Sequence, residues 1–80
     1  MGLREKQLRL LLTFHTTTAA MAMERACRDS GAPGRLIPVP RSITAGCGMS
    51  WSAPTETRAE LRRLTEEKSI PVAGEYELWL

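Results

Sequence analysis

The order in which strand-like and helix-like patterns follow one another is the feature that most limits the folds open to this chain. In residues 8–15, apolar side chains recur at every second position, namely Leu8, Leu10, Leu12 and Phe14. A two-residue period predicts a β-strand with one buried face. The chain has 80 residues, a length that suits one domain with a modest core.

A helix is predicted next, over residues 17–30. Thr16 or Thr17 can cap its N-terminus, and Gly31 suits the left-handed position that ends many helices. Pro33 discourages any continuation. The spacing predicts a buried stripe made of Ala19, Met23, Ala26 and Cys27.

Two extended segments follow, over residues 34–42 and 49–53, and we expect them to pair antiparallel. Pro38 and Pro40 lack a backbone N–H and are unable to donate to a neighbouring strand. The first of these segments is therefore predicted at an edge of the sheet. The loop between the two segments contains Cys47.

Residues 54–69 predict a second helix, in which Thr57 and Glu60 fit a capping box, with Thr55 as an alternative cap one turn earlier. Residues 70–80 predict a last strand. One of its faces carries Tyr76, Leu78 and Leu80, and the other carries Glu75, Glu77 and Trp79.

The order strand, helix, strand, strand, helix, strand predicts an α+β fold of the ferredoxin-like, split βαβ type. Its four-stranded antiparallel sheet carries both helices on one face, with the first and third strands central. We expect residues 1–80 to form a single domain, with residues 1–7 as a flexible start. Trp51 and Trp79 are candidates for the open face of the sheet, although one of them could instead pack in the core.

Composition argues against several kinds of protein. The net charge of +2 and the 5% aromatic content do not indicate a dedicated nucleic-acid binder. No apolar run approaches the roughly 20 residues that cross a membrane, and the start lacks the pattern of a secretory signal. We therefore expect a cytoplasmic protein that is a carrier, binding module or subunit rather than an autonomous enzyme, with no bound cofactor.

The loop sequence Gly46-Cys47-Gly48 is the clearest candidate for chemistry. Glycine neighbours leave the sulfur unshielded and the backbone N–H groups available to an anion. Arg35 and Arg41 could add positive potential, and Thr44 could add a hydroxyl donor. The alternative is that Cys47 is simply a small apolar residue in a tight turn.

Two further residues, His15 and Cys27, bear on the same chemistry. His15 ends the first predicted strand and could serve as a base for a thiol, or could be a partly exposed residue near a helix start. Cys27 lies on the predicted buried face of the first helix, where thiols are usually inert. Cys27, Cys47 and His15 are one ligand short of a structural zinc site, so no metal is expected.

The central part of the sequence resembles a family of small domains, the selenium/sulfur carrier protein-like family. The resemblance rests on three motifs: Phe14-His15-Thr16, residues 34–41 (GRLIPVPR), and residues 44–48 (TAGCG). It extends over about residues 8–80. The sequence departs from the Cys-x-x-Pro motif of better-known sulfur-relay carriers, because Gly-Met-Ser follows Cys47.

The resemblance implies that Cys47 is a carrier thiol. It would hold sulfur or selenium as a persulfide or selenopersulfide, and it would exchange that atom with donor and acceptor proteins. Two alternatives remain open. One is an interaction or regulatory module that uses the open sheet face to bind a partner or a second copy as a homo-oligomer. The other is a redox sensor that uses Cys47.

Overall fold

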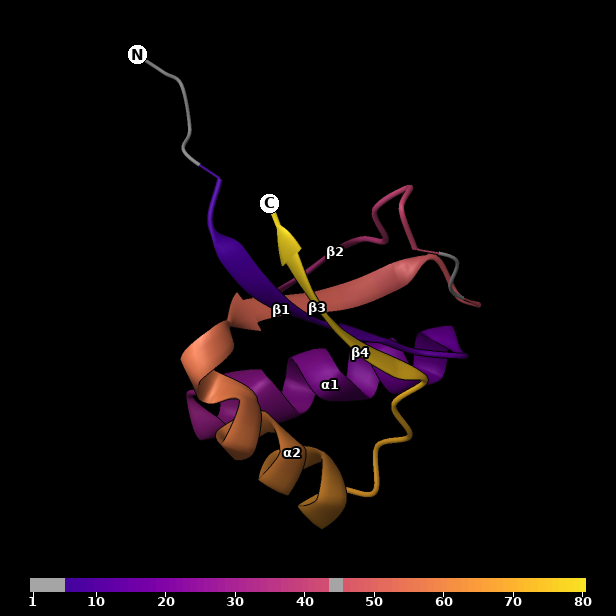
Figure 1. Ribbon diagram of the computed structural model, residues 1–80. Helices are drawn as coiled ribbons and strands as arrows, with labels where there is room; N and C mark the ends of the chain where they lie inside the picture. Colours follow the sequence, from indigo (N-terminus) through magenta and orange to yellow (C-terminus); the bar gives the residue numbers. More distant parts are fainter. Residues whose placement is uncertain (1–5, 44–45) are drawn as a thin grey trace.

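The strands and helices of the chain follow the predicted order (Figure 1). The structure, a computed structural model, describes residues 6–43 and 46–80. Its elements are β1 (Leu8–Thr13), α1 (Thr17–Ser30), β2 (Arg35–Pro38), β3 (Met49–Pro54), a 3₁₀ turn (Thr55–Thr57), α2 (Arg58–Glu67) and β4 (Gly74–Trp79).

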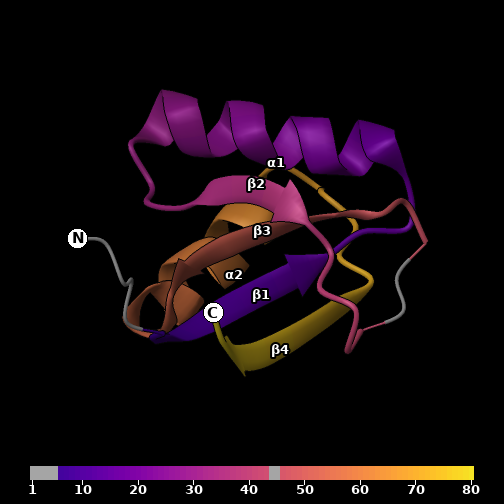
Figure 2. The same cartoon turned by 90° about the horizontal axis from the view of Figure 1, so that it is seen from above.

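The four strands form one antiparallel sheet in the order β2-β3-β1-β4. Both helices lie on the same side of it, and the other side is free of helices when viewed from above (Figure 2). This confirms the predicted α+β, split βαβ arrangement, with β1 and β3 central and β2 and β4 at the edges. Pro38, which has no N–H to donate, lies in edge strand β2 as expected.

Helix α1 begins and ends at the predicted residues. The Thr16 hydroxyl oxygen accepts a hydrogen bond from the Ala19 N–H at 3.1 Å, so Thr16 is the N-terminal cap. At the other end Gly31 has a φ of 78° and its N–H donates to the Cys27 carbonyl oxygen. Both ends therefore satisfy backbone groups that a helix leaves unpaired.

Helix α2 differs from the prediction at its start. The Thr57 side chain does not cap the helix, because its hydroxyl donates to the Pro54 carbonyl oxygen at 2.6 Å. That bond stabilises the 3₁₀ turn Thr55–Thr57, and the α-helix begins only at Arg58. The predicted capping box is therefore wrong.

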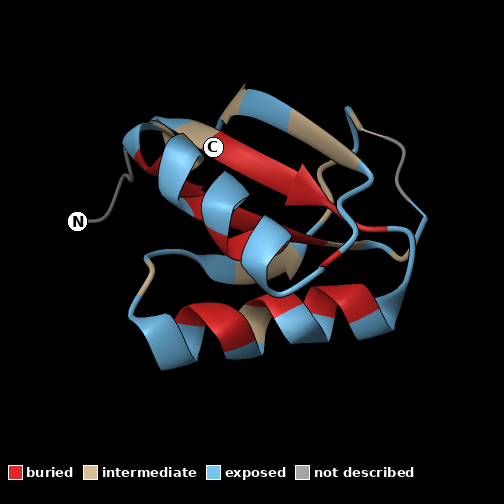
Figure 3. Ribbon diagram, turned by 90° about the horizontal axis from the view of Figure 1, so that it is seen from below, coloured by how far each residue is buried: buried red, intermediate tan, exposed pale blue. Residues whose placement is uncertain are grey.

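The core lies between the sheet and the two helices, where the inward faces of both helices are buried (Figure 3). The predicted stripe of α1 is confirmed. The largest buried contributions come from Leu10, Leu12, Phe14, Met23, Trp51 and Leu61. Burial of these apolar surfaces is the main favourable contribution to folding.

Trp51 belongs to this core and not to the open face. It is only 3% exposed, and its Nε1–H donates to the Pro33 carbonyl oxygen at 3.3 Å. The reason is the register: Trp51 lies opposite Leu12, which faces the helices. Trp79 also points to the helix side, since it lies opposite Leu8, yet it is 66% exposed.

Successive side chains of β4 point to opposite faces of the sheet, and its two carboxylates point toward α2. Glu75 and Glu77 lie opposite the helix-facing residues of β1. Arg62 of α2 holds the Glu75 carboxylate with two hydrogen bonds of 3.1 and 2.8 Å, and Arg58 pairs with both glutamates. Tyr76 is consequently turned to the open face of the sheet.

The ends of the described chain meet beside the sheet. Gln7 and Leu80 exchange backbone hydrogen bonds of 3.0 and 2.9 Å, which extends the pairing of β1 with β4 by one residue. Of the expected flexible start, residues 1–5 lie outside the described residues. Among the helices that are described, none has both the length and the apolar character needed to cross a membrane.

Gly34 gives a direct test of how Trp51 is packed. A Cβ at this position would lie 2.3 Å from Trp51 Nε1 and 2.7 Å from the Ser52 carbonyl oxygen, and the φ is +124°. We expect Gly34→Ala to lower the free energy of unfolding by at least about 2 kcal/mol, measured by urea denaturation.

Gly31→Ala is the matched control. Gly31 also has a positive φ, but a Cβ there would meet nothing within 4 Å. This change should cost only about 1 kcal/mol, the typical cost of a left-handed residue. Equal losses in the two variants would contradict the close packing of Trp51 on Gly34.

Candidate functional site

The loop that carries Cys47 connects β2 to β3. At its base, the Val39 N–H donates to the Gly48 carbonyl oxygen at 3.0 Å. A turn follows, in which the Ile43 N–H donates to the Pro40 carbonyl oxygen at 3.0 Å. The bond between Val39 and Gly48 therefore closes the hairpin, and Cys47 is the last residue of the loop that it encloses.

This loop lies against the connection between β1 and α1 at one end of the sheet (Figure 2). The Cys47 N–H donates to the Phe14 carbonyl oxygen at 3.3 Å. A Cβ on Gly46 would lie 3.1 Å from the His15 carbonyl oxygen. Cys47 is thus held beside the segment from which α1 starts.

The two glycines beside Cys47 are needed for different reasons. Gly46 allows the loop backbone to lie close to His15, where a Cβ would make a tight contact. Gly48 has a φ of 81° with open space around it, so its role is the left-handed backbone conformation. Together they fix the position of Cys47 without covering its sulfur.

The Cys47 residue is half-buried. One side of the residue packs against the edge of the core. Its Sγ–H donates a weak hydrogen bond to the Met49 carbonyl oxygen at 3.5 Å. Gly46 and Gly48, which flank it, are both exposed. The fold therefore positions a thiol that is only partly buried.

The structure brings some of the candidate residues together and separates others. His15 is exposed and follows Phe14, whose carbonyl oxygen binds the Cys47 N–H. Arg41 is exposed in the same loop as Cys47. Thr44 lies outside the described residues.

Arg35 is not part of this cluster. It lies opposite Ser52, at the far end of the β2–β3 ladder from Cys47. At about 3.3 Å per strand residue the separation along β3 is roughly 17 Å. Arg35 is therefore not available to stabilise an anion on Cys47. The sequence indicates that Arg35 belongs to the strand before the Cys47 loop. It does not indicate how far Arg35 lies from Cys47 along that hairpin.

Cys27 has the opposite environment. It is 1% exposed in the core, where burial, and secondarily the charge of Glu60, raise its pKa from 9.0 to about 11. A thiol reacts through its thiolate, so this cysteine is poorly suited to chemistry at neutral pH.

The two cysteines are also far apart. Cys47 lies next to Phe14, just before α1, and Cys27 lies near the other end of that helix. A rise of about 1.5 Å per residue puts Cys27 roughly 16 Å along the axis from Thr16. A disulfide needs Cα atoms within about 7 Å, so an internal disulfide would require a large rearrangement.

Within residues 6–43 and 46–80, no group of three or more His, Cys, Asp or Glu side chains is arranged to hold a metal ion. The described part of the site thus contains the partly buried Cys47 thiol, the histidine on the neighbouring connection and the arginine of the Cys47 loop.

Comparison with known proteins identifies the family of the chain. The profile of a family described as "Putative Se/S carrier protein-like" matches residues 9–77. The chain therefore belongs to this family of selenium/sulfur carrier-like proteins, as the resemblance of its motifs indicated. Comparisons with curated proteins and with solved structures found no match.

We expect the two thiols to differ sharply in alkylation. At about pH 8 and in the folded protein, iodoacetamide should modify Cys47 at least about 100-fold faster than Cys27, because Cys27 is buried and almost wholly protonated. Peptide mass spectrometry after timed quenching measures the two rates. In urea the rates should become similar, and similar rates in the folded protein would contradict the assignment.

The Cys27 pKa also predicts how stability depends on pH. The folded state favours the neutral thiol, so this contribution is complete below about pH 9 and is lost as pH rises through about 11. We expect the loss to be about 3 kcal/mol at most. Urea denaturation at several pH values measures it.

Cys27→Ala is the control for this pH dependence. It should be less stable than the wild type near neutral pH, because it leaves a small cavity. Its stability should nevertheless fall less steeply between about pH 9 and 11. Parallel curves for the two proteins would show that Cys27 does not titrate as described.

Proposed function

We propose that Cys47 carries sulfur or selenium as a persulfide or selenopersulfide and passes it to a partner protein. The observation that supports this most directly is the contrast between the two thiols: Cys47 is held at an accessible bend between two glycines, whereas Cys27 is enclosed in the core. Membership of the carrier-like family supports the same role. A cytoplasmic location would keep such a thiol reduced.

The transfer needs no oxidant or reductant. The Cys47 thiolate attacks the terminal sulfur of a donor persulfide, a bond forms between Sγ and that sulfur, and the donor S–S bond breaks. The donor leaves as a thiolate and takes up a proton. An acceptor nucleophile then attacks the same terminal sulfur and releases the Cys47 thiolate, so the carrier returns to its starting state.

The neighbouring residues suggest how the charges are handled. His15 is the titratable side chain on the connection that contacts the loop, and we propose it as the group that takes the Cys47 proton. Arg41 belongs to the same loop and would offset the negative charge of the bound persulfide. We keep Thr44 as a proposed hydroxyl donor to that anion, and we leave Arg35 out.

Loading with a persulfide donor tests the proposal. Incubated with inorganic polysulfide under anaerobic conditions, the wild-type protein should gain the mass of one sulfur atom, because only one thiol is accessible. Cys47→Ser should gain none, and Cys27→Ala should gain one. Intact-protein mass spectrometry, with peptide mapping, gives the number and place of the added atoms.

His15→Gln should load the same amount of sulfur several-fold more slowly at neutral pH, since a proton acceptor near the thiol is removed. Sulfur found on Cys27, or none in a folded protein whose Cys47 is free, would overturn the carrier role. Conversion of the protein to a disulfide-linked dimer in place of persulfide would favour a redox sensor.

A further inference from the structure

The face of the sheet that the helices leave free has a one-sided charge. The strand residues directed to it include Arg9 of β1 and Arg35 of β2. The carboxylates of β4, Glu75 and Glu77, point to the other side, where α2 binds them. Among the described strand positions, none places an Asp or Glu on the open face.

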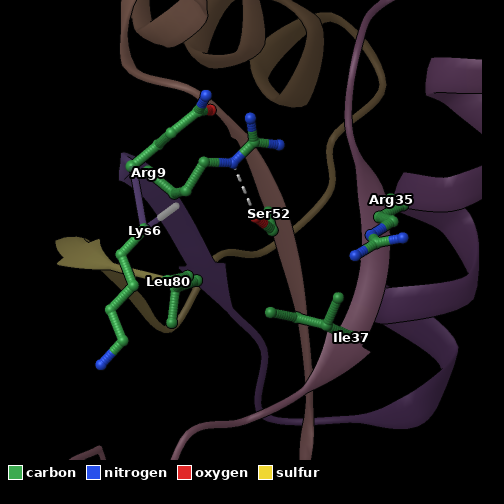
Figure 4. Close-up of a pocket in the computed structure, with 7 residues that line it drawn as sticks. Lys6, Arg9, Arg35, Ile37, Ser52 and Leu80 are labelled. Carbon is green, nitrogen blue, oxygen red and sulfur yellow. Dashed lines mark hydrogen bonds between the residues drawn. The ribbon is translucent and has the colours of Figure 1, made fainter. Parts of the chain in front are cut away.

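A broad cleft of about 780 Å³ lies on this open face (Figure 4). Three cationic side chains line it: Lys6, Arg9 and Arg35. Ser52 lies at its floor between the two arginines, and the apolar side chains of Ile37 and Leu80 complete its walls. The cleft is open to solvent along the sheet.

Arg9 is held in place by a hydrogen bond within the cleft. Arg9 Nε–H donates to the Ser52 hydroxyl oxygen at 3.2 Å, which draws the guanidinium across β3 and leaves its outer N–H groups directed away from that bond (Figure 4). Arg35 lies directly opposite Ser52 in the ladder. Ion pairs among residues 6–43 and 46–80 involve Arg58 and Arg62 rather than these cations.

The hydrogen-bond donors that line the cleft belong to side chains. The backbone N–H groups beneath it belong to paired strands, so they do not form the converging amide cradle that holds a single phosphate. Guanidinium groups match the planar fork of a carboxylate. Charged and apolar side chains side by side in an open cleft suit a peptide segment that lies across the sheet.

We propose that this cleft docks an acidic segment of a partner protein. The inference deepens the carrier function, since the partner would be a sulfur donor or acceptor. Arg9 lies near the start of β1 and Cys47 lies beside Phe14 just past its end, roughly 17 Å away along the strand. A partner held at the cleft therefore leaves the thiol uncovered for transfer.

A labelled peptide tests the docking surface without knowledge of the partner. The probe is a fluorescein-labelled ten-residue peptide of glutamates interrupted by two leucines, and its control has every glutamate replaced by glutamine. Fluorescence anisotropy should show saturable binding of the acidic peptide, much weaker binding of the control, and loss of affinity between about 50 and 500 mM salt.

Arginine replacements locate the binding site. Arg9→Ala and Arg35→Ala should each weaken the affinity about fivefold and together about twentyfold. Arg25→Ala is the matched control, because Arg25 is exposed on α1 on the other side of the sheet; it should leave the affinity unchanged. Cys47→Ser should also bind normally, and the arginine variants should still gain sulfur from polysulfide.

Peptide binding tests the docking proposal, and the gain of sulfur mass tests the carrier role. Failure of one can therefore be told apart from failure of the other. Inorganic pyrophosphate and a short uridine oligonucleotide are tested in parallel. Tight binding of either one with no binding of the peptide would overturn the proposal in favour of a phosphate or RNA site. No binding of any probe, or equal effects of Arg25→Ala and Arg35→Ala, would overturn it as well.

Discussion

The pairing of β1 on both of its edges is the constraint on which the rest of the structure depends. With β3 on one side and β4 on the other, β1 fixes which residues of those strands face the helices. Just past the end of β1, the Phe14 carbonyl oxygen accepts a hydrogen bond from the Cys47 N–H. The same strand therefore organises the core, positions the thiol loop at one end and presents Arg9 on the open face near the other.

Much of the fold follows from local sequence signals, because they act over a few residues. The alternation in β1, the Thr16 cap and the Gly31 terminus each place one element, and their order leaves few topologies. Signals that depend on tertiary partners were less informative. Thr57 binds Pro54 in place of capping α2, and Trp51 enters the core because its register with Leu12 directs it there.

In the candidate site too, local features could be predicted from the sequence, whereas tertiary contacts could not. Cys47 and its glycines were identifiable because a thiol between two flexible residues is unusual in itself. The contact with His15 depends on the approach of two loops far apart in the sequence, and the exclusion of Arg35 depends on the direction of β2. Arg9 could not be identified as a binding residue from the sequence, because only the register of the strands shows that it shares a sheet face with Arg35.

The two edges of the sheet differ in what they offer to another strand. Edge strand β2 ends in Pro38, with Pro40 shortly after it, and neither residue has an N–H to donate. Edge strand β4 contains no proline between Gly74 and Trp79. Growth of the sheet by edge-to-edge association is thus hindered on the β2 side, which protects the hairpin that carries Cys47 from being incorporated into a larger aggregate.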